Sequence, residues 1–232
     1  MTAGTVVGRS ATERVLVAVL LPVLGVAAAE AVNLLAPTIA GLPWAPLQGP
    51  FRLIARLPEP HTTVGAMVVG LVAGLVLVAI AAAEAVTVRV SDDDLAITRD
   101  DATTTVRRDQ VSAVYLAGRD LVVLGTRTEE LARQRVELSA GRLRAAFTRH
   151  GYPWRADGDP HAEAYRRWVP GLPGLPDAAD PLFRARARAL DRKHGDDADE
   201  LRGELGRLGV VVADRDGRQY FRQCPAPDRA DG

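Results

Sequence analysis

Two ionisable residues, Glu30 and Glu84, lie within the long apolar runs of this chain, each in the hexapeptide AAAEAV. An acid inside a bilayer is costly to bury, so such a residue is a functional hypothesis by default. Both glutamates lie near the ends of their runs, where headgroups and water are within reach. We favour an interfacial position for them. The alternative is a proton or ion path, which needs oligomers because two helices alone enclose no pore.

A second group with chemical potential is a basic run near the end of the chain. It has helical spacing and contains Arg184, Arg186, Arg188, Arg192 and Lys193. Such a face can bind RNA or an anionic membrane. A run of acidic residues follows it directly, comprising Asp196, Asp197, Asp199, Glu200 and Glu204. The favoured interpretation is therefore a pair of helices that neutralise each other, since mixed surface charge interacts weakly.

The sequence lacks the common catalytic and metal-binding patterns. Cys224 is the single cysteine, so neither an internal disulfide nor a CxxC metal site can form. The histidines show no ligand spacing, and no GxSxG, P-loop or dinucleotide motif occurs. The formal net charge is zero, which does not indicate a strongly basic nucleic-acid binder. We predict a protein that is not an enzyme and uses no cofactor and no metal.

Two apolar segments are long enough to cross a bilayer as helices. Residues 63–86 begin with an uncharged stretch that matches a ~30 Å hydrocarbon core, and residues 15–35 form a similar run. The first run also resembles a signal peptide, because Ala27-Ala28-Ala29 could serve as a small-residue cleavage site. Since its apolar character continues through Leu35, we favour an uncleaved span.

Positive charge near the spans predicts their orientation. Arg9 and Arg14 precede the first span, four arginines follow the second, and the Pro-rich loop of residues 36–62 holds two. The prediction is a multi-pass protein of the cytoplasmic membrane with both termini in the cytoplasm. In the second span, Gly70 and Gly74 have GxxxG spacing, which lets helices approach closely, so we expect a helix contact there that can drive dimerisation.

After the second span the pattern changes to short alternating segments bounded by turns. These segments predict strands, listed in chain order as residues 85–90, 95–99, 103–107, 111–116, 121–124 and 131–138. Ser139 can then cap a helix with Leu143, Ala146 and Phe147 on one face. We expect residues 87–154 to form a small β-barrel closed at one end by this helix.

At this point the residues resemble a family. The two-span hairpin, the segment AGRLRAAFTRHGYPW and the following DPHAEAYRRWVPGLPGLP are similar to YqeB-like bacterial membrane proteins. The resemblance implies a PH-like soluble domain and brings no catalytic motif with it. Residues 155–181 are Pro-rich and predict a linker, in which Tyr165 and Trp168 are expected to pack onto the barrel.

The last part of the chain predicts two helices and a β-hairpin over residues 182–224, followed by a disordered tail at 225–232. The segments ARARALDRKHGD and DADELRGELGRLGVVVADRDGRQYF resemble the anticodon-binding module of cysteinyl-tRNA synthetases. The resemblance implies that Arg184, Arg188, Arg192 and Tyr220 are candidates for binding RNA or another partner. The synthetases usually carry Trp where Tyr220 stands, which weakens the case for base stacking.

The sequence as a whole predicts a membrane-anchored α+β protein. It comprises a cytoplasmic N-terminal segment at residues 1–14, a two-helix transmembrane hairpin, a PH-like barrel and the helix-helix-β-hairpin unit. Our leading hypothesis is a non-enzymatic protein that presents these domains for protein interaction or self-association. The alternatives are a membrane-tethered RNA or tRNA binder and a small transporter or ion-path component.

Overall fold

The computed structural model describes residues 4–8, 10–40, 61–83, 85–99 and 102–225. These residues fall into two compact units, one of which holds the two long helices. The other holds the N-terminal strand, most of the β-rich region and the C-terminal module. Most of the expected Pro-rich loop, Glu84 and the expected tail beyond Pro225 lie outside the described residues.

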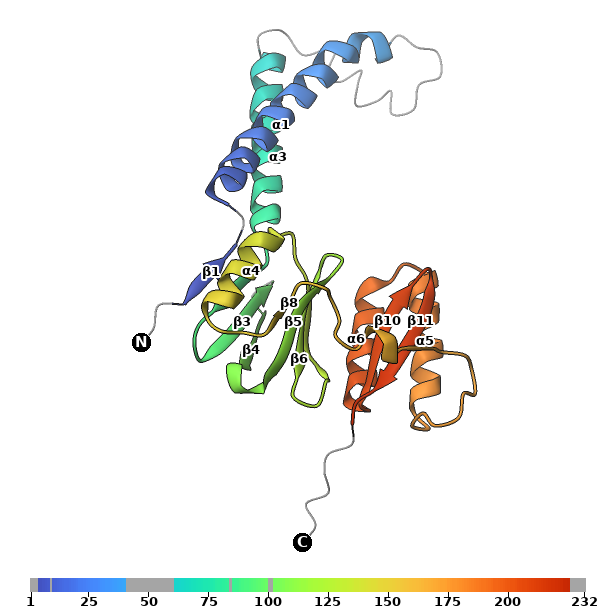
Figure 1. Ribbon diagram of the computed structural model, residues 1–232. Coiled ribbons are helices and arrows are strands. Elements are labelled where there is room, and N and C mark those ends of the chain that lie inside the picture. Colours follow the sequence, from blue (N-terminus) through green and yellow to red (C-terminus); the bar gives the residue numbers. More distant parts are fainter. Residues whose placement is uncertain (1–3, 9, 41–60, 84, 100–101, 226–232) are drawn as a thin grey trace. The chain divides into compact units, whose positions relative to one another are not determined.

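The two long helices are α1 (Ala11–Ala40) and α3 (His61–Ala83), drawn in blue and cyan-green in Figure 1. Both are long and apolar enough to cross a bilayer. Their large apolar side chains are mostly exposed, including those of Leu34 and Val69. A core helix of a water-soluble protein would instead be mostly buried. The exposure of these side chains therefore matches a surface that faces lipid.

The helices α1 and α3 touch through small residues. A Cβ atom added to Gly70 would overlap the backbone of Gly25, and one added to Gly74 would overlap Pro22. Only glycine allows this approach of the two backbones. The GxxxG face of α3 thus packs on α1 of the same chain, which gives the expected helix contact an intramolecular partner.

The β-rich region contains the six expected strands. They are β2 (Thr87–Val90), β3 (Asp94–Arg99), β4 (Ala102–Arg107), β5 (Val111–Ala117), β6 (Asp120–Gly125) and β7 (Glu130–Arg135). The expected helix is α4 (Ala140–Arg149), which buries Leu143, Ala146 and Phe147 as predicted. Ser139 occupies its N-cap position, but its side chain makes no capping hydrogen bond.

The prediction of a closed barrel is wrong. The strands form two separate four-stranded sheets, with orders β1-β2-β3-β4 and β7-β6-β5-β8. A 3₁₀ turn at Arg108–Gln110 separates β4 from β5, so the two strands do not continue as a hairpin. The free edge of β5 instead pairs in parallel with β8 (Trp154–Arg155). Helix α4 contacts β1 in one sheet and β8 in the other.

The N-terminal segment contributes a strand that the sequence analysis missed. Strand β1 (Thr5–Val7) pairs antiparallel with β2, with Thr5 opposite Val90 and Val7 opposite Val88. Val7 is buried in the sheet. Three residues give too short a pattern for periodicity to reveal a strand. The consequence is that the segment before α1 and the segment after α3 are neighbouring strands of one sheet.

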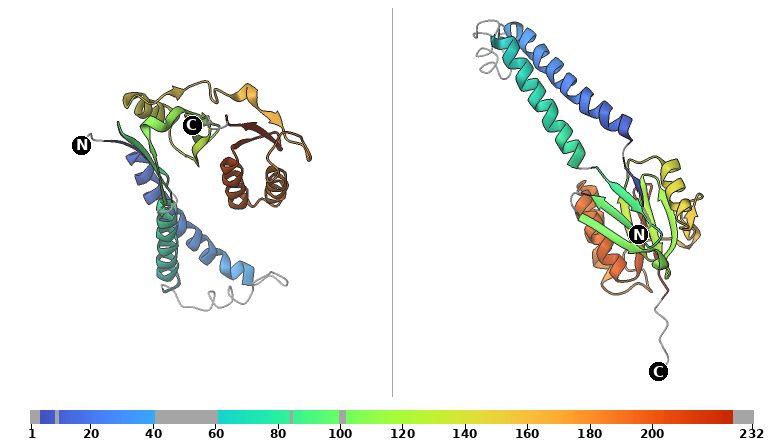
Figure 2. Two further views of the ribbon diagram at one scale, coloured as in Figure 1. Left: turned by 90° about the horizontal axis from the view of Figure 1, so that it is seen from below. Right: turned by 90° about the vertical axis from the view of Figure 1, so that its left-hand side faces the viewer.

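The C-terminal module packs two helices on a three-stranded sheet. Its elements are α5 (Ala179–Asp191), α6 (Gly195–Arg207), β10 (Val210–Arg215), β11 (Arg218–Gln223) and β9 (Arg166–Arg167), with sheet order β10-β11-β9. Figure 2 shows α5 and α6 side by side on the sheet. The core between these layers contains Phe183, Leu205, Val212 and Phe221.

The expected linker of residues 155–181 needs correction, because part of it belongs to the folded modules. It supplies the end of β8 and the edge strand β9. Trp168 does not pack on the β-sheets of the PH-like region. Its ring stacks on Phe183 at a centroid distance of 5.1 Å, because β9 pairs with β11 and carries Trp168 to the core of the C-terminal module.

We predict that Gly70→Ala destabilises the helix pair by about 1–3 kcal/mol, as overpacking does elsewhere. The added methyl group would force the α1 and α3 backbones apart. The matched control is Gly65→Ala in the same helix, where a Cβ would meet nothing within 4 Å. We expect this control to be neutral or slightly stabilising, since alanine favours helix. Unfolding of both variants in mixed micelles, followed by circular dichroism, measures the difference, and equal effects would contradict the contact.

Candidate functional site

The structure divides the basic residues of α5 between the inside and the outside of the C-terminal module. Arg184 is exposed and forms an ion pair with Asp180 at 2.7 Å. Arg188 and Arg192 are exposed and make no ion pair with another described residue. Arg186 is 1% exposed and points into the core. It lies three residues from both Phe183 and Ala189, which are also buried, so all three share one helix face.

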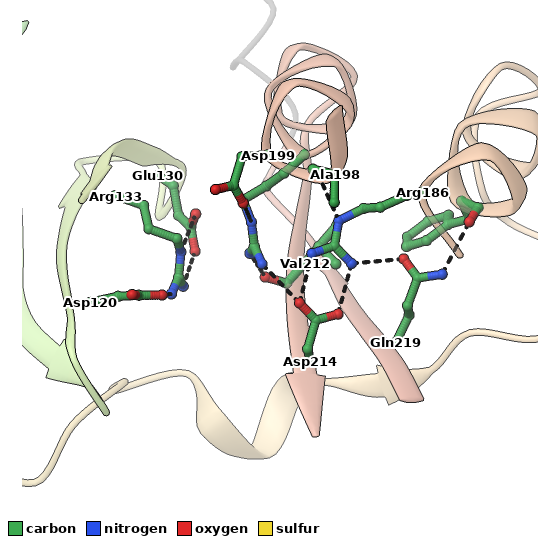
Figure 3. Close-up of polar contacts among 11 residues, drawn as sticks. Asp120, Glu130, Arg133, Arg186, Ala198, Asp199, Val212, Asp214 and Gln219 are labelled. Carbon is green, nitrogen blue, oxygen red and sulfur yellow. Dashed lines mark hydrogen bonds and ion pairs between the residues drawn. The ribbon is translucent and has the colours of Figure 1, made fainter. Parts of the chain in front are cut away.

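Arg186 is the centre of a buried hydrogen-bond network (Figure 3). Its two terminal nitrogens donate to the two carboxylate oxygens of Asp214 at 2.7 and 2.6 Å. It also donates to Gln219 Oε1 at 2.9 Å and to the carbonyl of Ala198 at 3.1 Å. Gln219 in turn donates to the carbonyl of Phe183 at 3.0 Å. One guanidinium thus ties α5 to α6, β10 and β11. The expectation that Arg186 belongs to an exposed basic face is therefore wrong.

Asp214 also binds Arg202 of α6, whose Nη2 lies 3.0 Å from Asp214 Oδ2. Burial alone would raise the pKa of the Asp214 carboxyl, but hydrogen bonds and charge from Arg186 hold that pKa below its ordinary value. Burial lowers the pKa of Arg202, and the nearby positive charges of Arg133 and Arg186 lower it further. The network therefore stabilises the fold of the C-terminal module by joining its helices to its sheet.

Tyr220 lies on the other face of the sheet from α5. Along β11, Gln219 and Phe221 face the helices, so Tyr220 and Arg222 alternate to the opposite side. The guanidinium carbon of Arg215 lies 5.4 Å from the centre of the Tyr220 ring. The structure therefore does not bring Tyr220 together with Arg184, Arg188 and Arg192, and these four residues do not form one site.

The sequence analysis did not predict a groove that lies on the helix side of the module. It measures about 250 Å³ and lies between α5 and the ends of β9 and β11. Its lining includes Arg167, Trp168, Val169, Leu190 and Arg218. The available signal was the apolar pair Trp168-Val169 directly after Arg166-Arg167.

In the helix pair, Asn33 Nδ2 lies 3.5 Å from Glu30 Oε2. The other carboxylate oxygen, Glu30 Oε1, is buried without a hydrogen-bond partner among the described residues. Because Glu84 falls outside the described residues, an ion path that uses both glutamates stays a prediction.

Three side chains of the β-rich region have the geometry of a proton relay. His150 Nδ1 lies 2.7 Å from Asp92 Oδ1, and His150 Nε2 lies 2.8 Å from Thr5 Oγ1. The same order of carboxylate, imidazole and hydroxyl activates nucleophiles in hydrolases. Here His150 is buried at the end of α4, and its contacts join α4 to β1 and to the β2–β3 turn. The arrangement works as a tie that holds β1 in the sheet.

The described residues contain no group of three or more His, Cys, Asp or Glu side chains that could hold a metal ion. Cys224 is a free cysteine, and burial raises the pKa of its thiol. A raised pKa leaves little thiolate at neutral pH, which does not suit a reactive cysteine.

The sequence of this chain is similar to known proteins. A family model described as the YqeB-like bacterial PH domain matches residues 5–155. The chain belongs to the YqeB-like family of bacterial PH-domain proteins. A protein of Bacillus subtilis (strain 168), named "Uncharacterized protein YqeB", is 32% identical over 220 residues, which is 95% of this chain and 92% of that protein. No solved structure matches the chain.

The limits of the YqeB-like match agree with the sheet topology. The match begins at Thr5, the first residue of β1, and ends at Arg155, the last residue of β8. The domain of this family member therefore includes β1 and carries the helix pair as an insertion between β1 and β2. A second model, the cysteinyl-tRNA ligase anticodon binding domain, matches residues 172–222, which contain α5, α6, β10 and most of β11.

We predict that Arg186→Ala lowers the free energy of unfolding by about 3 kcal/mol, because it leaves the carboxylate of Asp214 without its main partner. This is the low end of the range for broken buried pairs, since Asp214 keeps some contact with water. The matched control is Arg188→Ala on the exposed side of the same helix, expected within about 0.5 kcal/mol of wild type. Chemical denaturation of the full chain measures both variants. Equal effects would contradict the role assigned to Arg186.

The lowered pKa of Asp214 predicts a pH dependence of stability. A carboxyl group whose pKa is lower in the folded state stabilises the protein above its unfolded pKa of about 3.9. This contribution is lost as the pH falls through the folded pKa. We expect the stability difference between wild type and Asp214→Asn to stay constant from about pH 7 to 5 and to shrink below about pH 4. A difference that grows on acidification would contradict the assignment.

Proposed function

We propose that this protein is a non-enzymatic membrane adaptor, which holds a PH-like domain and a C-terminal module at the cytoplasmic face for binding to another protein. The observation that carries the proposal is the pair of exposed apolar helices inserted between neighbouring strands of one sheet. The described polar networks support structural roles. The Asp92–His150–Thr5 contacts do not line the groove between α5 and the sheet.

The pairing of β1 with β2 supports a specific topology. Because β1 directly precedes α1 and β2 directly follows α3, their pairing supports a topology in which both ends of the helix pair are on the same side of the membrane. Cleavage after Ala29 would remove β1, together with buried Val7 and the Thr5–His150 contact. This argues against a cleaved signal peptide. The arginines that flank the helices support a cytoplasmic position for this shared side.

A second candidate function is a membrane-tethered RNA binder, which is favoured by the match to the anticodon binding domain. Arg188 of α5 and Arg192, directly after α5, are exposed basic residues that form no ion pair with another described residue. This candidate expects RNA binding that weakens steeply with salt and falls when both arginines are replaced by alanine. Filter binding of bulk tRNA to the full chain in nanodiscs measures it, and salt-independent retention would count against it.

The topology yields a direct prediction. A chain with one epitope tag at each end should keep both tags in the mature membrane protein, and protease should remove both tags only from inverted membrane vesicles. A tag inserted between α1 and α3 should show the reverse accessibility and provides the control. Loss of the N-terminal tag from the mature protein, or opposite accessibility of the two terminal tags, would overturn the proposed anchoring.

A further inference from the structure

One face of the C-terminal sheet carries three arginines that come from three different strands. The register places Arg215 of β10 opposite Arg218 of β11, and Arg167 of β9 opposite Tyr220 of β11. Side chains alternate along a strand, and Gln219 faces the helices, so these four side chains lie on the face away from α5 and α6. Direct and diagonal cross-strand neighbours on one face are within about 8 Å of each other, so the three guanidinium groups can reach a single ligand.

This arrangement of charge is unfavourable for the protein alone. Arg215 and Arg218 are directly opposite each other, and like charges in such positions destabilise a sheet. Both of them and Arg167 are exposed, and none forms an ion pair with another described residue. The acidic residues next to Arg215 and to its contact at Ala162 are Asp216 and Glu163, which are exposed and not paired with these arginines. A local conflict that the fold leaves unrelieved is expected at a functional site, and here it indicates an anionic ligand.

The guanidinium of Arg215 is held in place by its neighbours. Its Nη2 donates to the carbonyl oxygen of Ala162 at 3.2 Å. Its central carbon lies 5.1 Å from the centre of the Tyr165 ring and 5.4 Å from that of Tyr220, within the range of cation–π attraction. Because these contacts fix the planar group before a ligand arrives, less conformational entropy is lost on binding.

We propose that Arg167, Arg215 and Arg218 form a surface that binds an acidic segment of a partner protein. Asp or Glu side chains of that segment accept hydrogen bonds from the guanidinium groups, whose planar donors match the two oxygens of a carboxylate. Such a segment also removes the repulsion between Arg215 and Arg218. The inference rests on the proposed adaptor function and names both the surface and the chemistry of its partner.

An acidic protein segment fits this surface better than RNA does. Proteins that bind single-stranded RNA stack successive bases on the faces of aromatic side chains. Here the ring of Tyr220 is already in contact with Arg215, and Tyr165 is buried beneath Arg215 and Arg222. Bound carboxylates need the arginines and no free aromatic ring.

The test uses the full chain in nanodiscs of zwitterionic lipid, with a phage library of random 12-residue peptides as the probe. We expect the recovered peptides to carry several Asp or Glu residues. By fluorescence anisotropy, Arg167→Glu and Arg218→Glu should each weaken binding of the selected peptides about tenfold or more, equivalent to about 1.4 kcal/mol. The matched control is Arg142→Glu, an equal change of charge on the exposed side of α4, which should change binding less than about twofold.

Thermal unfolding without peptide supplies an independent readout. Arg218→Glu places an opposite charge across from Arg215, so its Tm should equal that of wild type or exceed it by up to about 4 °C. Lost binding in a variant of equal or higher stability cannot be explained by misfolding. A lower Tm would show that Arg218 stabilises the free protein, which contradicts the repulsion on which the proposal rests.

The other outcomes separate this inference from the adaptor function itself. Recovered peptides that lack acidic residues, or that bind Arg218→Glu as tightly as wild type, overturn the proposed surface and leave the adaptor function intact. Bulk tRNA that displaces the peptides from wild type, and whose own binding is lost in Arg218→Glu, assigns the surface to RNA and overturns the proposal. Recovery of no peptide of any composition contradicts both.

Discussion

The pairing of β1 with β2 is the constraint on which the placement of the helix pair in the chain depends. A sheet that recruits strands from both sides of an insertion can form only when the two ends of that insertion come together. In this chain the insertion is the helix pair, and its ends are held by three residue pairs of β-ladder and by the Thr5–His150–Asp92 tie. The close glycine contact between α1 and α3 also keeps the two helices of this insertion together.

The C-terminal module depends on one buried guanidinium. An arginine removed from water needs a charged partner and hydrogen bonds to most of its donors. Asp214, Gln219 and the carbonyl of Ala198 meet this need for Arg186, and they come from β10, β11 and α6. The contacts fix which face of α5 points inward. They also fix which residues, among them Leu190 and Ala187, remain to line the groove.

Local patterns in the sequence predicted most of the helices and strands. The features that the sequence analysis missed depend on contacts between segments that are far apart in the chain. The strands from Thr87 to Arg135 and the helix after Ser139 follow from alternation and from apolar spacing. The burial of Arg186 depends on Asp214, which lies 28 residues away, so helical spacing alone places this arginine on a basic face. The open sheets depend on β8 reaching β5, and the position of Trp168 depends on the pairing of β9 with β11. Neither pairing leaves a local signal.

The two faces of the C-terminal sheet are not equally free to bind a partner. On the face opposite the helices, Arg222 is buried and donates to the side chain and the carbonyl of Thr128, at 2.9 and 2.6 Å. Thr128 belongs to the β6–β7 turn and has a φ of 66°, a conformation that costs energy for a β-branched residue and is held by its surroundings. This end of the face is therefore engaged by the protein itself. The helix side instead carries the groove that Trp168, Val169 and Leu190 line.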